Sequence, residues 1–305
     1  MSFPLQMMRV TLKTLRWLRG EQLPTLQTAR QRFRRIGRFT KMSKKTAISQ
    51  LGANGVSCEY YTTADADTSN LIVFLHGGGY CVGSLDTYRA WLSRVVELGN
   101  IPILAVAYQQ APEHPFPTAP SNALSAYEWA LEHHSGKNIF LLGDSAGGGL
   151  CLSIMLKMRE ENIPMPQAAI LIAPWVDLTL QQSSLTRLAH RDLIMRKKDL
   201  EMLVHLYIGR ESATNPFISP LYADLAGLPP IYIQQGTDDL FFDEVNELHK
   251  KLLSAGVKSK LEIWKGMPHV WHVMYDQVKE ARQATRKIID FIAETAKNKN
   301  LGQTN

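Results

Sequence analysis

The stretch NIFLLGDSAGGGL, residues 138–150, constrains the fold of this chain more than any other. Residues 138–142 form a short apolar run that suits a buried strand, and LCLSIMLKMREE from Leu150 onward has helical apolar spacing. Ser145 therefore lies on a sharp turn between a strand and a helix. Glycine at 143 and 147 removes side chains that would clash in such a turn. The pattern is G-x-S-x-G, which presents a serine hydroxyl beside a helix N-terminus.

A glycine-rich helix start can also bind phosphate, and this is the alternative interpretation. The turn contains no lysine, and the segment does not match G-x-x-x-x-G-K-[ST], so a nucleotide loop is disfavoured. The pattern alone does not establish a nucleophile. It requires a base, an acid and oxyanion donors elsewhere in the chain, in the order that an α/β sheet imposes.

A second glycine cluster, FLHGGGY at residues 74–80, ends an apolar run upstream of Ser145. Backbone N–H groups in such a loop can point at a ligand because no side chain shields them. We expect Gly78 and Gly79 to donate to an oxyanion together with the N–H of Ala146. His76 is expected to orient the loop rather than to act as a base. The alternative is a loose glycine turn.

The acid and the base are expected after the last two strands. In IYIQQGTDDLFFDE, Asp239 lies where the loop leaves the strand and is favoured as the acid; Asp238 is the alternative. In EIWKGMPHVWHVM, His269 is favoured as the base over His272. The order Ser145, Asp239, His269 is that of α/β-hydrolases and differs from the chymotrypsin and subtilisin orders.

Strand and helix patterns alternate along most of the chain. This alternation predicts an α/β fold with a mostly parallel sheet and helices on both faces. Expected strands are 56–62, 70–79, 101–109, 138–142, 167–175, 229–236 and 259–266; expected helices include 87–100, 121–136 (capped by Ser121), 243–255 and 278–297. Residues 178–228 interrupt the pattern with a helical stretch at 192–209 and are expected to form a cap insertion where ligands bind. With a cap segment at 1–45, they would cover a catalytic domain at 46–305.

Charge is divided unevenly along the chain. Residues 1–50 hold twelve Lys or Arg and one acid, while the whole chain has a formal net charge of +6. The body is therefore net acidic, and no nucleic-acid partner is expected. In residues 3–20, an apolar stripe of Leu5, Met8, Leu12 and Leu15 lies beside a basic stripe of Arg9, Lys13, Arg16 and Arg19. This helix is interpreted as packed on the body, with weak membrane-surface contact or an organelle transit peptide as alternatives.

Two further features bear on the cellular setting. No apolar run reaches the roughly 18 residues that span a bilayer, and no secretory h-region is recognised, so we expect neither a membrane span nor a secretory signal. Cys58, Cys81 and Cys151 lie far apart without metal-ligand spacing, so we expect reduced thiols in the cytoplasm and no metal site. An exposed edge strand would allow a homodimer.

Six stretches together resemble the hormone-sensitive lipase-like carboxylesterases of the α/β-hydrolase fold. They are HGGGY (76–80), YQQAPEHPFP (108–117), GDSAGG (143–148), PWVDLT (174–179), SPLYADLAGLPPIYIQQGTDD (219–239) and GMPHVWH (266–272). The resemblance covers nearly all of the chain after about residue 50. It implies hydrolysis of small acyl esters without a cofactor, an N-terminal lid, and Gly78, Gly79 and Asp239 in the roles given above. The segment DDLFFDE differs from the common DPLRDE, which leaves Asp238 open.

The resulting hypothesis is a serine carboxylesterase that acts on short- to medium-chain acyl esters through an acyl-enzyme intermediate. Two other hypotheses remain. One is a lipase that acts at lipid interfaces with help from the basic N-terminal helix. The other is a ligand-binding hydrolase fold without catalysis, as in plant hormone receptors that lack a working histidine.

Overall fold

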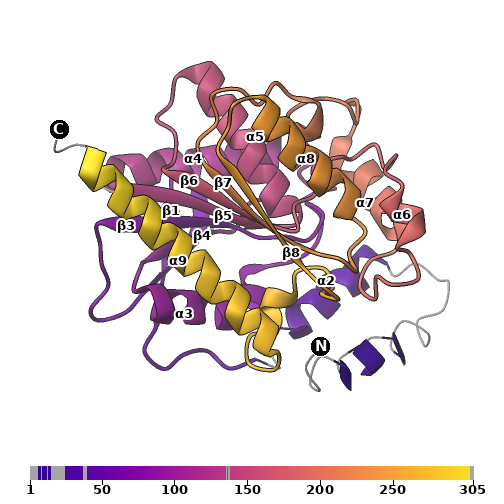
Figure 1. The fold of residues 1–305 in the computed structure, drawn as a ribbon, viewed down its shortest axis with the longest axis horizontal. Coiled ribbons are helices and arrows are strands. Elements are labelled where there is room, and N and C mark those ends of the chain that lie inside the picture. Colours follow the sequence, from indigo (N-terminus) through magenta and orange to yellow (C-terminus); the bar gives the residue numbers. More distant parts are fainter. Residues whose placement is uncertain are drawn as a thin grey trace.

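The computed structural model describes residues 6, 7, 9–11, 13, 14, 25–36, 40–134, 136 and 138–302. Within them, eight strands form one sheet with helices on both faces (Figure 1). The predicted α/β architecture is confirmed. The strands are β1 (Ala47–Ala53), β2 (Val56–Thr62), β3 (Asn70–Leu75), β4 (Ile103–Val106), β5 (Asn138–Asp144), β6 (Ala168–Ile172), β7 (Ile231–Gly236) and β8 (Ser259–Trp264).

The strand order is β1-β2-β4-β3-β5-β6-β7-β8. Strand β2 runs antiparallel to β1 and β4, and all the other neighbouring pairs are parallel. The carboxyl ends of β3, β5, β7 and β8 therefore meet at one edge of the sheet, which is where open α/β folds bind their ligands. The glycine loop, the serine turn, the acid loop and the histidine loop all leave the sheet from this edge.

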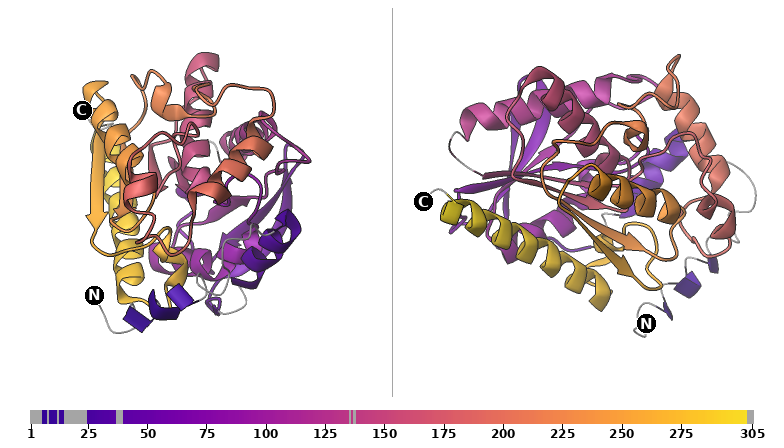
Figure 2. Two further views of the ribbon diagram at one scale, coloured as in Figure 1. Left: turned by 90° about the vertical axis from the view of Figure 1, so that its right-hand side faces the viewer. Right: turned by 45° about the horizontal axis from the view of Figure 1, so that its top comes forward.

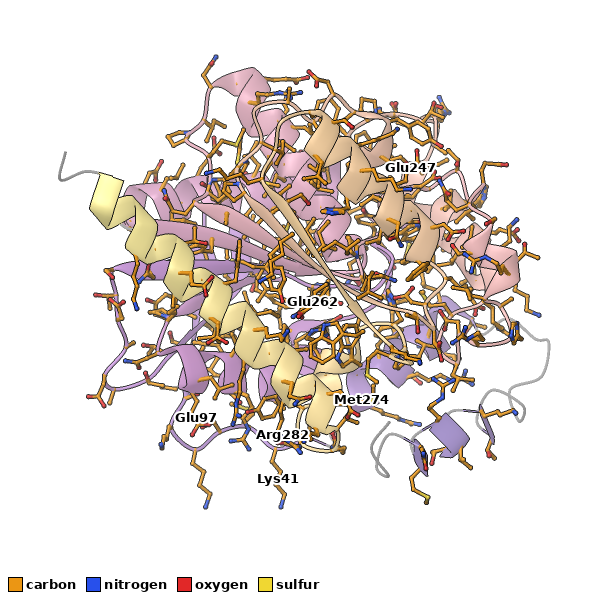
Figure 3. The ribbon with its side chains drawn as sticks, in the orientation of Figure 1. Lys41, Glu97, Glu247, Glu262, Met274 and Arg282 are labelled. Atoms are coloured by element: carbon orange, nitrogen blue, oxygen red, sulfur yellow. The ribbon has the colours of Figure 1, made fainter. Side chains whose placement is uncertain are left out.

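Helices form a layer on each face of the sheet (Figure 2). Strand β3 shows why, because Leu71, Val73 and Leu75 face one hydrophobic cluster while Ile72 and Phe74 face the other. The first cluster includes residues of α4 (Thr118–His133), α5 (Ala146–Glu161) and α8 (Phe242–Ser254), and the second includes residues of α3 (Leu85–Gly99) and α9 (Lys279–Gly302). Side chains fill the space between the sheet and both helical layers (Figure 3).

Two local predictions were wrong, and one strand was not predicted. Strand β1 was not expected, because AISQLGA is polar and mostly exposed. Helix α4 begins at Thr118, so Ser121 is not its cap; its hydroxyl donates to Pro117 O (3.0 Å) inside the first turn. Helix α7 (Lys197–Ile208) begins five residues later than expected, because the Asp192 carboxylate accepts the N–H groups of Ile194 and Met195 and holds them in a turn.

Two segments lie above the carboxyl edge of the sheet. One contains α2 (Leu26–Ile36), and the other is the expected insertion, with α6 (Ser184–Arg187), α7 and the short η2 (Pro220–Tyr222) (Figure 1). Of the predicted N-terminal stripes, Arg9 and Lys13 lie in described helical positions, while Leu5, Met8, Leu12, Leu15, Arg16 and Arg19 lie outside the described residues. No helix in the described ranges has the length and apolar character needed to cross a membrane.

Candidate active site

Ser145 occupies a strained turn between β5 and α5. Its backbone angles are φ 52° and ψ −123°, a conformation that a side chain adopts only when its surroundings enforce it. Its N–H donates to Ile172 O (2.8 Å), and its carbonyl accepts the N–H of Trp175 (2.9 Å). These bonds fix the turn to β6 and to the segment after β6. The hydroxyl is thereby presented at the N-terminus of α5.

The crowding of glycines around Ser145 has a direct steric cause. A Cβ on Gly143 would lie 2.3 Å from Gly147 O, and one on Gly147 would lie 2.0 Å from Leu75 O. A Cβ on Gly149 would lie 2.2 Å from Trp175 O. Helix α5 therefore begins in backbone contact with β3, β5 and the segment after β6, which is possible only without side chains.

The loop His76–Gly83 carries the predicted oxyanion donors. Gly78 and Gly79 have φ angles of 121° and 57°, and both line the same cavity as Ser145. Within the described residues, their N–H groups have no hydrogen-bond acceptor, whereas Gly77 N donates to the Asp144 carboxylate (2.9 Å). Ala146 is the first residue of α5, where N–H groups lack an intrahelical partner. Two amides of the glycine loop thus border the cavity that contains Ser145, and the amide of Ala146 directly follows the serine.

His76 is placed as a structural residue of this loop. Its Nδ1 donates to Gly77 O (2.7 Å), and its ring stacks on Tyr108 at a centroid distance of 4.3 Å. Burial lowers the pKa of His76 to about 4, so the ring stays neutral. The placement agrees with the expectation that His76 orients the loop.

The structure brings His269 and Asp239 together. The Nδ1–H of His269 donates to Asp239 Oδ2 (2.9 Å), and Asp239 Oδ1 accepts the N–H of Phe241 (2.9 Å). Asp238, the alternative acid, instead forms ion pairs with Arg9 and Arg191. Its carboxylate therefore binds one arginine near the N-terminus and one in the insertion, and it does not contact the imidazole.

The alternative base, His272, lies in the 3₁₀ turn η3 (Trp271–Met274). Its Nε2 donates to Gln234 Oε1 (2.7 Å), and it is completely buried. Burial lowers the pKa of His272 to about 3, which keeps the ring neutral. These contacts assign it to the core between the sheet and α3.

Three buried carboxylates control the charge on His269. Burial alone disfavours the imidazolium, but the negative charge and hydrogen bond of Asp239 outweigh burial, and the pKa of His269 is raised above its usual 6.5. Asp192 and Asp144 contribute in the same direction. Burial raises the pKa of Asp144 to about 7 and that of Asp192 to about 6. The site therefore raises the affinity of the imidazole for a proton above that of a free histidine.

Asp144 and Asp192 are residues that sequence reasoning missed. Asp144 accepts the N–H of Gly77 and the hydroxyl of Tyr88 (2.8 Å), so it joins the serine turn to the glycine loop. Its position beside Ser145 was a usable signal. Asp192 accepts the N–H of Leu240 (3.0 Å) and so ties the insertion to the acid loop. No motif surrounds Asp192 in the sequence.

Ser145 and His269 line a cavity of about 220 Å³. Helix α2 contributes Ala29 and Phe33 to its wall, and the insertion contributes Ile194, Met195, Asp199, Leu200, Met202 and Leu203. Trp175 and Leu203 lie directly over Gly79. The wall is mostly apolar, so it suits a hydrocarbon group placed beside the serine. In the described part of the chain, no cluster of His, Cys, Asp or Glu could hold a metal ion.

Comparison with known proteins identifies the family. Residues 72–273 match the family described as alpha/beta hydrolase fold. The chain belongs to this family. An acetyl-hydrolase of Streptomyces hygroscopicus is 34% identical to this α/β-hydrolase over 229 residues, which cover 75% of this chain and 76% of that protein.

Solved structures agree with this assignment. An esterase from the bacterial hormone-sensitive lipase family superposes with a TM-score of 0.92 at 32% identity, covering 97% of this chain and 99% of the other. EstE5 soaked with p-nitrophenyl butyrate gives a TM-score of 0.89 at 31% identity, with the same coverage. The predicted α/β-hydrolase fold, the resemblance to hormone-sensitive lipase-like carboxylesterases and the classification as an ester hydrolase are confirmed.

The contact between Gly147 and β3 leads to a testable expectation. Gly147→Ala should lower the free energy of unfolding by about 1–3 kcal/mol, because its Cβ would overlap Leu75 O and force the turn to shift. Denaturant unfolding measures this change. Gly52→Ala is the matched control, since nothing lies within 4 Å of its Cβ position. Equal effects of the two substitutions would contradict the steric explanation.

Proposed function

We propose that Ser145, His269 and Asp239 form the catalytic triad of this esterase. The observation that carries the proposal is the hydrogen bond between His269 Nδ1 and Asp239 Oδ2 (2.9 Å) beside a cavity that also contains Ser145. His269, paired with Asp239, thus lines the same cavity as Ser145, although the three residues are far apart in the sequence. The same arrangement disfavours a non-catalytic ligand-binding fold, because the histidine is present and paired with its acid.

The proposed reaction proceeds in two steps. Ser145 Oγ attacks the ester carbonyl carbon while His269 accepts the hydroxyl proton, and Asp239 stabilises the resulting imidazolium. His269 then protonates the departing alcohol, which leaves an acyl-enzyme. Water, deprotonated by His269, attacks the acyl carbon; the bond from this carbon to Ser145 Oγ then breaks as His269 returns the proton to Oγ, which releases the carboxylic acid and restores the serine.

The N–H groups of Gly78, Gly79 and Ala146 would bind the negative oxygen that forms in each step. Their lack of protein acceptors supports this role, because the donors need not break other bonds first. Loss of one such donor typically costs about 3–4 kcal/mol of transition-state stabilisation.

Short- to medium-chain acyl esters are the proposed substrates. The cavity of about 220 Å³ is smaller than the roughly 300–1,000 Å³ typical of sites for drug-sized ligands. The similarity to EstE5, solved after soaking with p-nitrophenyl butyrate, supports the same size class. In this proposal, α2 and the insertion form the cap, and residues 46–305 form the catalytic domain.

Further proposals concern the setting of the enzyme. A homodimer through β8 is supported by its edge position and by the exposed Ile263, and sedimentation of Ile263→Lys against wild type tests it.

A cytoplasmic location is supported by three buried free cysteines, and cell fractionation tests it. Weak membrane-surface contact through the basic N-terminal segment is supported by its charge, and vesicle flotation tests it.

The triad is tested by replacing its nucleophile. Ser145→Ala should abolish hydrolysis of p-nitrophenyl butyrate and covalent labelling by a fluorophosphonate, because both need the hydroxyl. Ser153→Ala is a matched control, since this buried serine donates to Phe217 O away from the cavity. Circular dichroism checks that both variants are folded. Wild-type turnover by Ser145→Ala would refute the assignment.

Activity should depend on the protonation of His269. The base must be neutral, and its pKa is raised above 6.5, so kcat/KM should fall as the pH drops through a value above 6.5. At higher pH the neutral form dominates and a plateau is expected. A pH profile with p-nitrophenyl butyrate, read at the isosbestic wavelength of the product, measures this. A flat rate from about pH 4 to about pH 9 would contradict the role of His269.

The cavity wall should set the preferred chain length. The kcat/KM for p-nitrophenyl esters should be highest for short chains and fall toward palmitate. Leu203→Ala should shift the optimum to longer chains, because Leu203 lies over Gly79. Val204→Ala removes similar volume from the same helix outside the cavity and should leave the optimum unchanged. Greater activity on emulsified triglyceride than on soluble esters would favour the lipase alternative.

A further inference from the structure

The loop that carries the proposed oxyanion donors is strained. Gly78, Gly79 and Tyr80 are three consecutive residues with positive φ angles, at 121°, 57° and 61°. Tyrosine rarely adopts this conformation, and such segments persist only where their surroundings hold them. The position of the two glycine amides therefore depends on what holds the loop.

The loop is held mainly through its carbonyl groups. The segment that follows β4 supplies most of the donors: Tyr108 Oη to His76 O (2.7 Å), Ala111 N to Tyr80 O (3.0 Å), and Gln110 Nε2 to Val82 O (3.0 Å) and Gly83 O (3.1 Å). Gly78 O accepts the N–H of Val82 within the loop (2.9 Å). With these carbonyls occupied, the N–H groups of Gly78 and Gly79 stay directed into the cavity.

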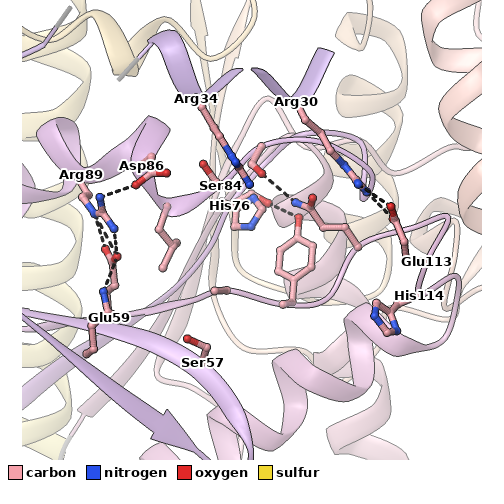
Figure 4. A pocket seen from close by; sticks show the side chains of 16 residues that line it. Arg30, Arg34, Ser57, Glu59, His76, Ser84, Asp86, Arg89, Glu113 and His114 are labelled. Carbon is pink, nitrogen blue, oxygen red and sulfur yellow. Dashed lines mark hydrogen bonds and ion pairs between the residues drawn. The ribbon is translucent and has the colours of Figure 1, made fainter. Parts of the chain in front are cut away.

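One carbonyl of the loop is bound from elsewhere. Arg30 on α2 donates from Nε to Cys81 O (2.8 Å) and from Nη2 to Ala111 O (2.9 Å). The same guanidinium makes two bonds to the Glu113 carboxylate, at 2.7 and 2.6 Å. In Figure 4, Arg30 and Glu113 face each other at one side of a polar cavity of about 530 Å³. A single planar group thus joins α2, the oxyanion loop and the segment after β4.

Among the described residues that precede β3, no other side chain forms a hydrogen bond with this loop. Helix α2 also has an independent attachment, because Phe33 O accepts the Thr87 hydroxyl (3.0 Å). Removing Arg30 would therefore free the loop from α2 without by itself detaching the helix. The remaining contacts of Arg30 are made to the oxyanion loop and its supporting segment, not to the substrate cavity.

We propose that Arg30 is a positioning residue for the oxyanion hole. By holding Cys81 O and Ala111 O, it keeps the amides of Gly78 and Gly79 aligned with the ester carbonyl, a role that rests on the proposed function. Helix α2 then has two separate tasks: Ala29 and Phe33 form the wall of the substrate cavity, and Arg30, on the neighbouring face, fixes the donors. Loss of Arg30 should impair the transition state more than substrate binding.

The test compares Arg30→Ala with two variants nearby. Arg34→Ala is the matched control, because Arg34 lies one turn later on α2 and has no hydrogen bond or ion pair among the described residues. Glu113→Gln removes the carboxylate charge but leaves the bonds from Arg30 to Cys81 O and Ala111 O. For Arg30→Ala we expect kcat to fall by about 10- to 100-fold with KM nearly unchanged, since small misplacements of catalytic groups have effects of this size.

Arg34→Ala should keep wild-type kcat, and Glu113→Gln should lose less than Arg30→Ala. Added guanidinium ion should restore part of the activity of Arg30→Ala. If Arg30→Ala does not fold, Arg30→Lys replaces it; a single ammonium cannot bind all three partners, so kcat should again fall. A kcat for the folded variant equal to that of wild type, or an equal loss in Glu113→Gln, would overturn the proposal.

Labelling with a fluorophosphonate separates this proposal from the proposed function. Its phosphoryl oxygen uses the same donors, so Arg30→Ala should be labelled at Ser145 more slowly than wild type. Wild type that fails to label at Ser145 would refute the triad itself. Wild type that labels normally, with Arg30→Ala labelling at the same rate, would refute only the role of Arg30.

Discussion

The turn at Ser145 is possible only because the backbone of α5 approaches β3 closely. Gly147 lies against Leu75 O at a distance that excludes any Cβ, and Gly143 lies against Gly147 O in the same way. This contact places the start of α5 directly beside the end of β3, where the glycine loop begins. The serine and the proposed oxyanion donors are therefore adjacent as a consequence of strand and helix packing. Asp144 strengthens the junction by accepting the N–H of Gly77.

The electrostatics of the site follow from how deeply it is buried. A buried imidazole alone would lose its proton easily, but Asp239, with Asp192 and Asp144 nearby, reverses this tendency. Backbone N–H groups bind each of these carboxylates and offset part of the cost of removing it from water, although burial still raises the pKa of Asp144 and of Asp192. In the proposed mechanism, the imidazolium is thus stabilised by the Asp239 carboxylate, which is already hydrogen-bonded to the ring, and little reorganisation is needed.

Much of the fold and of the candidate site could be predicted from the sequence, because both depend on local patterns. The apolar runs that form β3, β5, β6 and β7 are buried on both faces of the sheet, and the two glycine motifs occur in the order that an α/β-hydrolase requires. Strand β1 was missed because its exposed polar residues carry no such pattern. Asp238 and Asp239 are adjacent, so spacing could not separate them; the difference arises from Arg9 and Arg191, which approach Asp238 from distant segments. Asp192 and Arg30 were missed for the same reason.

Described residues before β1 and residues of the insertion are bonded to the loops that follow β3 and β7, and this affects how the site can open. Arg191 and Arg9 form ion pairs with Asp238 beside Asp239, Asp192 accepts the N–H of Leu240, and Arg30 donates to Cys81 O in the glycine loop. The same segments supply most of the apolar wall around Ser145. A movement that widens the cavity must therefore strain bonds to the loops that carry the proposed acid or the proposed oxyanion donors. Substrates too large for the closed cavity should meet a less well-aligned site as well as a steric barrier, so the cap would select for size at the level of catalysis and not only of binding.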